Sequence, residues 1–314
     1  MDEFELIRSL LGELPSNDKV VAGAGDDCAV LDLGLPGRWL LFKTDAVVEG
    51  IHFTAGTSPE KIGHKALARC LSDLAAMAGT PTAALITLGL PREFDPSFIK
   101  AIYRGMKPLA ERHGVAIVGG ETTTNPDRLL ISISAIGTVE KGKCPRRSGA
   151  QAGDAIFVTG EMGGSLAGKH LEFEPRLREA HWLADRFAIH AMMDISDGLA
   201  GDLRHILHAS HVGAELLARA IPISRAARKP GASGELAPSS AKPPLLAALT
   251  DGEDFELLFT VASRDAVTLL DAWKKEFPKL RLSCVGKILA EPGLRIRDTR
   301  GVRSLNAEGY VHFK

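Results

Sequence analysis

The stretch GAGDDCAVL, residues 23–31, places two adjacent acids between glycines and the start of an apolar run. The apolar run predicts a short strand entering a core, and the glycines predict a turn just before that strand. Two neighbouring carboxylates repel each other and resist burial, so they need solvent, backbone donors or a cation. We expect Asp26 to hydrogen-bond the turn and Asp27 to face a metal ion.

Outward from this turn, the chain alternates between strand and helix patterns, which predicts an α/β (α+β) fold in two units of similar size. The expected boundaries are an N-terminal domain at 1–140 and a C-terminal α/β domain at 141–314. Helices are predicted at 2–12, from Ser58–Pro59 to near Gly79, at 198–209, and ending at Gly114 and near 188. Strands are predicted at 28–33, 39–45, 82–90, 115–120, 129–137, 154–160 and 188–194, and residues 222–244 as a long surface loop.

Composition excludes several classes of protein. The 314 residues are 45% hydrophobic, enough for a sizeable core, and the formal net charge of −1 predicts no general attraction to nucleic acid or to a membrane surface. No apolar run is long enough to span a membrane, and the first residues, MDEFELIRSLLGELP, carry acids where an export signal needs a basic region. The four cysteines are scattered, as in reduced proteins. We expect a cytoplasmic protein.

Acids recur where strands end and loops begin. The segments are GDD (25–27), KTD (43–45), GGET (119–122), DISD (194–197) and DGED (251–254), and Asp73 lies in a largely apolar helical stretch. Each acid alone is explained by a turn or a helix cap. Several acidic loops at strand ends together predict a site for hard cations such as Mg²⁺, which take oxygen ligands and bridge substrate phosphates.

One segment imitates a phosphate-binding loop. GGSLAGKH, residues 163–170, follows a predicted strand and comes within one residue of the pattern G-x-x-x-x-G-K-[ST]. His170 stands where that pattern requires the hydroxyl that ligates Mg²⁺. We therefore interpret these glycines as the opening of a helix.

The motifs, taken together and in order, resemble one enzyme family. GAGDDCAVL, KTDAVVEGIHF, KALARCLSDLAAMAGTP, VGGETT, RRSGAQAGDAIFVTG, MMDISDGLAGDL, DGEDFELLFT and EGYVHF are similar to the motifs of thiamine-monophosphate kinases, in the aminoimidazole ribonucleotide synthetase-like superfamily. The resemblance spans nearly the whole chain. It implies an N-terminal domain whose strands pair across a homodimer, a C-terminal α/β domain, and a cleft that holds ATP with several Mg²⁺ ions.

The resemblance also implies roles for single residues. It implies metal ligands at Asp27, Thr44, Asp45, Asp73, Glu121, Asp194 and Asp197, ATP contacts at Gly120, Glu121, Arg147 and Ser196, and substrate contacts at His52, Glu253 and Tyr310. Lys43 stands at a further ligand position where a small hydroxyl residue is usual. Glu121 replaces an aspartate, and Asp251 stands where a second glycine is common. Because an ammonium cannot bind a cation, we expect Lys43 to supply positive charge to a phosphate instead.

The implied activity is ATP-dependent phosphorylation of thiamine monophosphate to the diphosphate by direct in-line transfer. The attacking phosphate oxygen is already anionic, so no general base is assigned. Alternatives are another ATP-using member of the superfamily, such as an aminoimidazole ribonucleotide synthetase, or a nucleotide-binding regulator that lost catalysis through Lys43 and Glu121. No cysteine precedes Cys28 and the chain ends GYVHFK, which disfavours selenophosphate synthesis and hydrogenase maturation, respectively.

Overall fold

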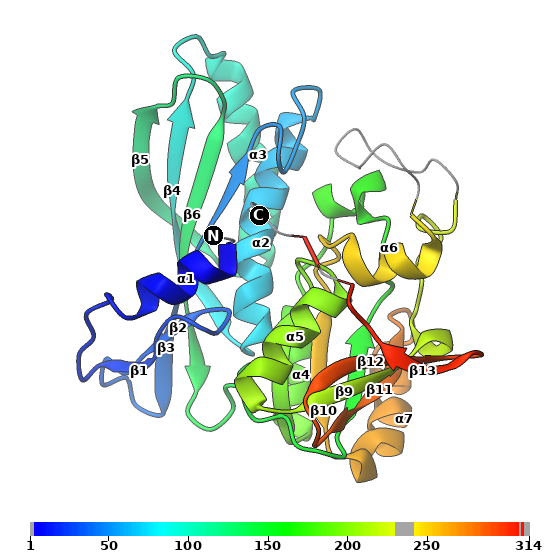
Figure 1. Cartoon of the computed structure of the whole chain (residues 1–314). Helices are drawn as coiled ribbons and strands as arrows, with labels where there is room; N and C mark the ends of the chain where they lie inside the picture. The colour runs from blue at the N-terminus through cyan, green and yellow to red at the C-terminus, as the bar shows by residue number, and fades with distance from the viewer. Residues whose placement is uncertain (1–2, 230–241, 308, 311–314) are drawn as a thin grey trace.

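The computed structural model describes residues 3–229, 242–307 and 309–310, and it contains two sheets with their own helices (Figure 1). The first half of the chain forms α1 (Glu3–Leu11), β1 (Val20–Ala22), β2 (Ala29–Leu31), β3 (Arg38–Val48), α2 (Pro59–Ala76), β4 (Thr80–Leu90), α3 (Pro96–Arg112), β5 (Ala116–Thr124) and β6 (Leu130–Glu140). Its sheet has the order β1-β2-β3-β6-β4-β5.

The second half forms a larger sheet of order β13-β12-β9-β11-β7-β10-β8. Its elements are β7 (Ala155–Thr159), α4 (Leu177–Arg186), β8 (Ile189–Asp194), α5 (Leu199–Ser210), β9 (Gly213–Leu217), α6 (Pro244–Thr250), β10 (Leu257–Val261), α7 (Ala266–Glu276), β11 (Leu282–Leu289), β12 (Gly293–Asp298) and β13 (Gly301–Ser304). Most neighbouring strands are antiparallel, whereas β12 and β9 are parallel. The fold class expected from the sequence is confirmed.

Helix α2 stands between the two sheets (Figure 1). It packs on β3 and β6 with one side and contacts α4 and β8 with another. Pro59 occupies its first turn, where the missing N–H is no loss, and thirteen of its positions are buried. Because both halves of the chain pack on α2, polar side chains on this helix lie at the boundary between the domains.

The N-terminal sheet has one covered face and one open face. Helices α2 and α3 lie on the covered face, which presents buried residues such as Ile86 and Ile133. The other face presents Thr44, Ser134 and the exposed apolar side chains Phe42 and Leu85. A sheet that exposes apolar side chains on one face is typical of a surface that binds another protein.

The helix predicted to open within residues 163–170 is absent, and the loop predicted at 222–244 lies mostly outside the described residues. Gly164, in a left-handed conformation, precedes a 3-10 turn at Ser165–Ala167, so no α-helix opens there. Lys169 Nζ contacts Glu256 Oε1 at 2.8 Å, and the lysine of a phosphate-binding loop is therefore not available. Most of the predicted loop at 222–244 falls in 230–241, outside the described residues. Within the described ranges, no helix is both long and apolar enough to cross a membrane.

Candidate functional site

Three buried carboxylates meet at the boundary between the domains. Asp27 lies in the turn before β2, Asp73 in the last turns of α2, and Asp194 at the end of β8. One oxygen of each lies within 4.8 Å of the others. The contact between α2 and β8 brings Asp73 and Asp194 together, although they are far apart in the sequence. We call these three residues the acid cluster.

Burial and mutual repulsion disfavour the ionised forms of Asp73 and Asp194. Burial, with Asp27 adding repulsion, raises the pKa of Asp194 to about 7, and burial also raises the pKa of Asp73. Ser72 Oγ donates to Asp194 Oδ2 at 2.6 Å. Asp27 Oδ1 accepts from Arg147 Nη2 at 2.6 Å, while Asp27 Oδ2 is buried with no hydrogen-bond partner among the described residues. Converging buried carboxylates with an unpartnered oxygen fit a hard divalent cation such as Mg²⁺.

The adjacent Asp26 has a different contact. Its Oδ1 accepts a hydrogen bond of 2.7 Å from the backbone N–H of Arg147, in the segment that leads into the second domain. The expected hydrogen bond to its own turn is therefore replaced by one that joins the two halves of the chain. Within GDD, the first acid contacts the backbone of the second domain and the second faces the acid cluster.

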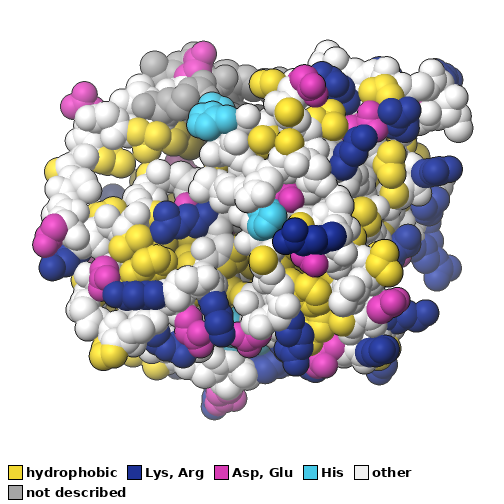
Figure 2. Space-filling model, turned by 90° about the horizontal axis from the view of Figure 1, so that it is seen from below, with side chains coloured by type: hydrophobic (Ala, Val, Ile, Leu, Met, Phe, Trp, Pro, Cys, Tyr) yellow, Lys and Arg dark blue, Asp and Glu magenta, His cyan; other side chains and the backbone are white. Residues whose placement is uncertain are grey.

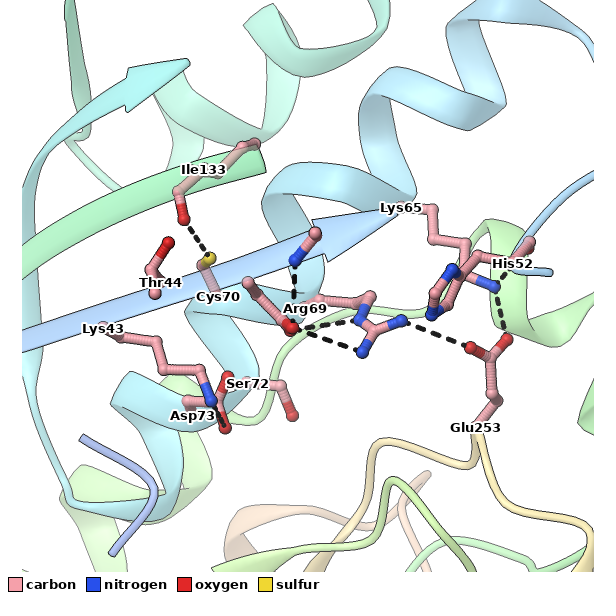
Figure 3. Close-up of polar contacts among 12 residues, drawn as sticks. Lys43, Thr44, His52, Lys65, Arg69, Cys70, Ser72, Asp73, Ile133 and Glu253 are labelled. Atoms are coloured by element: carbon pink, nitrogen blue, oxygen red, sulfur yellow. Dashed lines mark hydrogen bonds and ion pairs between the residues drawn. The ribbon is translucent and has the colours of Figure 1, made fainter. Parts of the chain in front are cut away.

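Lys43 and Asp45 of β3 contact side chains of α2. Lys43 Nζ lies 3.1 Å from Asp73 Oδ1 (Figure 3). Although burial works against the charged form, Asp73 and Asp45 raise the pKa of Lys43. An ammonium has no lone pair to offer a metal, and Lys43 places its positive charge beside Asp73; its expected contact with a phosphate stays a prediction. Asp45 accepts from Arg69 Nε at 3.0 Å and from Arg69 Nη2 at 3.3 Å.

Thr44 and Glu121 lie on the other face of the N-terminal sheet. Thr44 Oγ1 contacts the hydroxyls of Ser132 and Ser134 at 3.4 and 3.3 Å, on the open face. Glu121 pairs with Thr87 on β4, which pairs with Ser132 on β6, so its exposed side chain shares that face. Within one chain, their side chains are therefore not brought to the acid cluster. The preceding residue, Gly120, has a φ of 155° and packs against the backbone of Ile86, where a side chain has no room.

Asp197 is not one of the three grouped carboxylates of the acid cluster. Its ligand atoms fall in a second group with Asp202 and His205, all within 4.8 Å of one another. Asp202 Oδ2 accepts from the backbone N–H groups of Asp197 and Gly198, at 3.1 and 3.0 Å, at the start of α5. The backbone of this acidic loop is thus fixed by Asp202.

Asp197 also lines a cavity of about 190 Å³. The three expected substrate contacts, His52, Glu253 and Tyr310, line this cavity together with Ser196 and Asp197. Ser196, an expected ATP contact, therefore shares a cavity with them; its carbonyl oxygen accepts from the N–H of Glu253 at 2.7 Å. We call this cavity the acceptor pocket.

The loop that carries Glu253 has an unusual backbone. Glu253 and Phe255 adopt φ values of 55° and 49°, a left-handed conformation that costs free energy in non-glycine residues. Gly252, with a φ of 74°, approaches the backbone of Ser196 closely. Asp251 is right-handed helical, so no glycine is needed at that position. Strain of this kind is common at functional sites.

The sequence analysis missed two cations of α2, Lys65 and Arg69. Lys65 is fully buried; its Nζ donates to the carbonyl oxygen of His52 at 2.6 Å and forms an ion pair with Glu253 (Figure 3). Burial lowers the pKa of Lys65 to about 8. Spacing is the signal that could have revealed them, because Lys65, Arg69 and Asp73 follow one another at intervals of four and share one face of the helix.

Comparisons with known proteins find relatives that match both domains of the chain. The model described as AIR synthase related protein, N-terminal domain, matches residues 25–139, and the corresponding C-terminal domain model matches residues 151–299. The thiamine-monophosphate kinase of Rhodopirellula baltica is 38% identical over 99% of this chain and 97% of its own length. The Bacillus subtilis enzyme of that name is 34% identical over 100% of both.

A solved structure matches this chain over nearly its whole length. AaThiL, complexed with AMPPCP and TMP, superposes with a TM-score of 0.81 at 30% identity, over 99% of this chain and 97% of that one. The superposition therefore spans both domains of the chain. The chain belongs to the thiamine-monophosphate kinase family.

Proposed function

We propose that the chain transfers the γ-phosphoryl group of ATP to thiamine monophosphate, which gives thiamine diphosphate. The observation that carries this proposal is the acceptor pocket at the boundary between two AIR synthase related domains, lined by Ser196 and Asp197 of the loop that follows Asp194 of the acid cluster. A relative of the same fold binds AMPPCP and TMP, which supports ATP and thiamine monophosphate as the two substrates.

The chemistry needs positioning more than proton transfer. The attacking atom is a phosphate oxygen that already carries negative charge, so no side chain has to remove a proton. We propose that Asp27, Asp73 and Asp194 hold Mg²⁺, which would offset the repulsion between two polyanions and align them. Arg147, whose Nη2 contacts Asp27, has a guanidinium suited to ATP phosphates. His52, Glu253 and Tyr310 would hold the acceptor.

Resident cations reduce the number of metal ions that the site requires. Lys43 faces Asp73 and Arg69 faces Asp45, so two proposed magnesium ligands already have a positive partner. We propose that fewer Mg²⁺ ions bind here than at a site with a hydroxyl residue at position 43. The cation of Lys43 would then interact with a phosphate of ATP.

The direct test is turnover. Purified protein with ATP and MgCl₂ should form thiamine diphosphate from thiamine monophosphate, and ATP consumption should depend on that acceptor. Formylglycinamidine ribonucleotide, the acceptor of the aminoimidazole ribonucleotide synthetase alternative, should not stimulate ATP consumption. Product formation from that acceptor, or nucleotide binding with no turnover of either, would contradict the proposal.

Magnesium should stabilise the protein more at pH 8 than at pH 5.5. Because the pKa of Asp194 is raised to about 7, the neutral carboxyl is favoured in the folded state. Its contribution to stability is fully present below the ordinary pKa near 3.8 and is lost as the pH rises through 7. Binding of Mg²⁺ to the ionised cluster offsets that loss. The shift of melting temperature by MgCl₂, measured by scanning fluorimetry at both pH values, checks this; equal shifts would contradict it.

We propose that the open face of the N-terminal sheet forms a homodimer interface. Support comes from the exposed apolar side chains of Phe42 and Leu85 and from Thr44 and Glu121, whose side chains point away from the acid cluster of their own chain. A partner's strands would cover these residues. We further propose domain boundaries at 1–140 and 141–314, and the cytosol as the compartment.

Leu85→Glu should convert the dimer into a monomer, because a buried unpaired carboxylate opposes association. Sedimentation velocity measures the change. Val267→Glu is the matched control, since Val267 is 70% exposed on α7 and outside this face. A wild-type monomer, or a Leu85→Glu protein that stays dimeric, would overturn the interface.

A further inference from the structure

Arg69 reaches from α2 across the boundary between the domains. Its Nε and Nη2 donate to the two oxygens of Asp45, while its Nη1 lies 3.6 Å from Glu253 Oε1 in the strained loop of the other domain (Figure 3). The last distance is an ion pair too long for a hydrogen bond. Arg69 therefore lies between a proposed magnesium ligand and a proposed acceptor contact.

The charges around the acceptor pocket are distributed unevenly. Among the described residues that line it, three are acids, namely Asp197, Asp251 and Glu253, and Arg69 is the one lysine or arginine. Thiamine monophosphate carries a cationic thiazolium at its centre and an anionic phosphate at one end. Lys242 pairs with Asp251 at 2.9 Å and Lys65 with Glu253, but neither lysine lines the pocket. The acids of the lining suit the thiazolium, so the phosphate needs a positive partner in the lining, and this step rests on the proposed function.

We propose that Arg69 binds the phosphate of thiamine monophosphate and is therefore a catalytic residue of the transfer. Its planar fork of N–H groups matches phosphate oxygens, and it lies one helical turn from Asp73 of the acid cluster on α2. A guanidinium there reduces repulsion between the acceptor phosphate and the phosphates of ATP.

When Arg69 exchanges Glu253 for a phosphate, Glu253 keeps a cationic partner. Glu253 has Lys65 as a second partner, and the fully buried Lys65 is fixed by the carbonyl oxygen of His52. Phe255 lies under the guanidinium, with 6.0 Å between Arg69 Cζ and the ring centroid. The side chain is thus supported by an aromatic face while its Nη1 can turn to a phosphate.

The alternative is that Arg69 only forms an ion-pair contact between the domains. The two roles predict different effects on the binding of thiamine monophosphate and of thiamine when Arg69 is replaced. If Arg69 only joins Asp45 to Glu253, its loss should weaken the binding of thiamine monophosphate and of phosphate-free thiamine equally. If Arg69 binds the phosphate, only thiamine monophosphate should lose affinity.

The experiment compares wild type, Arg69→Met and Arg69→Lys by calorimetric titration with thiamine monophosphate and with thiamine. We expect Arg69→Met to weaken thiamine monophosphate binding about ten- to a hundredfold, as the loss of a charge-assisted hydrogen bond does, with thiamine within about twofold. Arg69→Lys should restore part of the affinity. The KM for ATP should change by less than about threefold while the KM for thiamine monophosphate rises.

Arg104→Met is the control, because Arg104 is exposed on α3 and pairs with Glu60. Unchanged thiamine monophosphate binding in Arg69→Met, or equal losses for both ligands, would overturn the role of Arg69. If Arg69→Met does not fold, the same comparison with Arg69→Lys decides. Failure of wild type to phosphorylate thiamine monophosphate would instead overturn the proposed function, so the two results are distinguishable.

Discussion

Asp194→Asn should lower kcat by about a hundredfold or more and leave the melting temperature at pH 8 unchanged or higher. Loss of a metal ligand removes several kcal/mol of transition-state stabilisation, and each ~1.4 kcal/mol is a factor of ten in rate. Stability should not fall, because the amide removes one of three crowded buried charges and its oxygen still accepts from Ser72 Oγ. Steady-state kinetics and scanning fluorimetry measure the two quantities.

The same variant should lose most of the stabilisation by MgCl₂. Asp185→Asn is the matched control, because Asp185 is an exposed aspartate that pairs with Lys143. Its kcat should stay within about twofold of wild type, as for surface changes away from a site. Full activity of Asp194→Asn would remove Asp194 from the mechanism, and an equal loss of stability and activity would indicate a structural role.

Asp27→Asn and Asp26→Asn should separate two adjacent acids by their function. Asp27 faces the acid cluster with an unpartnered oxygen, so Asp27→Asn should lower kcat about a hundredfold or more. Asp26 accepts from the backbone N–H of Arg147, a bond that an asparagine oxygen can also accept. Asp26→Asn should therefore keep kcat within about threefold and lower the free energy of unfolding by about 1 kcal/mol.

Kinetics of both variants at saturating MgCl₂, together with urea unfolding, make this comparison. The two residues are neighbours in one turn, so any general disturbance of the turn affects both. Equal losses of kcat in the two variants would contradict separate roles. Normal turnover by Asp27→Asn would show that the acid cluster works without it.

The sequence predicted the fold because hydrophobic periodicity is local. Strand and helix patterns from β2 to α5 needed only neighbouring residues, and Pro59 marked the start of α2. The meeting of Asp27, Asp73 and Asp194 was expected from acids at strand ends and from a resemblance; their role as metal ligands stays a prediction. The positions of Thr44 and Glu121 on the open face required the strand register, which no single segment contains.

The ion pairs of α2 could not be derived from the chain alone. Lys65 and Glu253 are 188 positions apart, and whether a buried lysine finds a carboxylate depends on how the two domains pack. Helical spacing could have placed Lys65, Arg69 and Asp73 on one face of α2. It could not have identified the residues with which they form ion pairs. Charge in a buried helix is thus the sequence signal for a site, whereas the identity of the partner is a property of the fold.

Anomalous scattering from Mn²⁺ in place of Mg²⁺ tests the central claim most directly. Crystals grown with MnCl₂ and a non-hydrolysable ATP analogue should show an anomalous peak coordinated by oxygens of Asp27, Asp73 and Asp194, with the analogue's phosphates on the same ion. An anomalous map with the nucleotide bound but no peak within coordination distance of these three carboxylates would contradict the account.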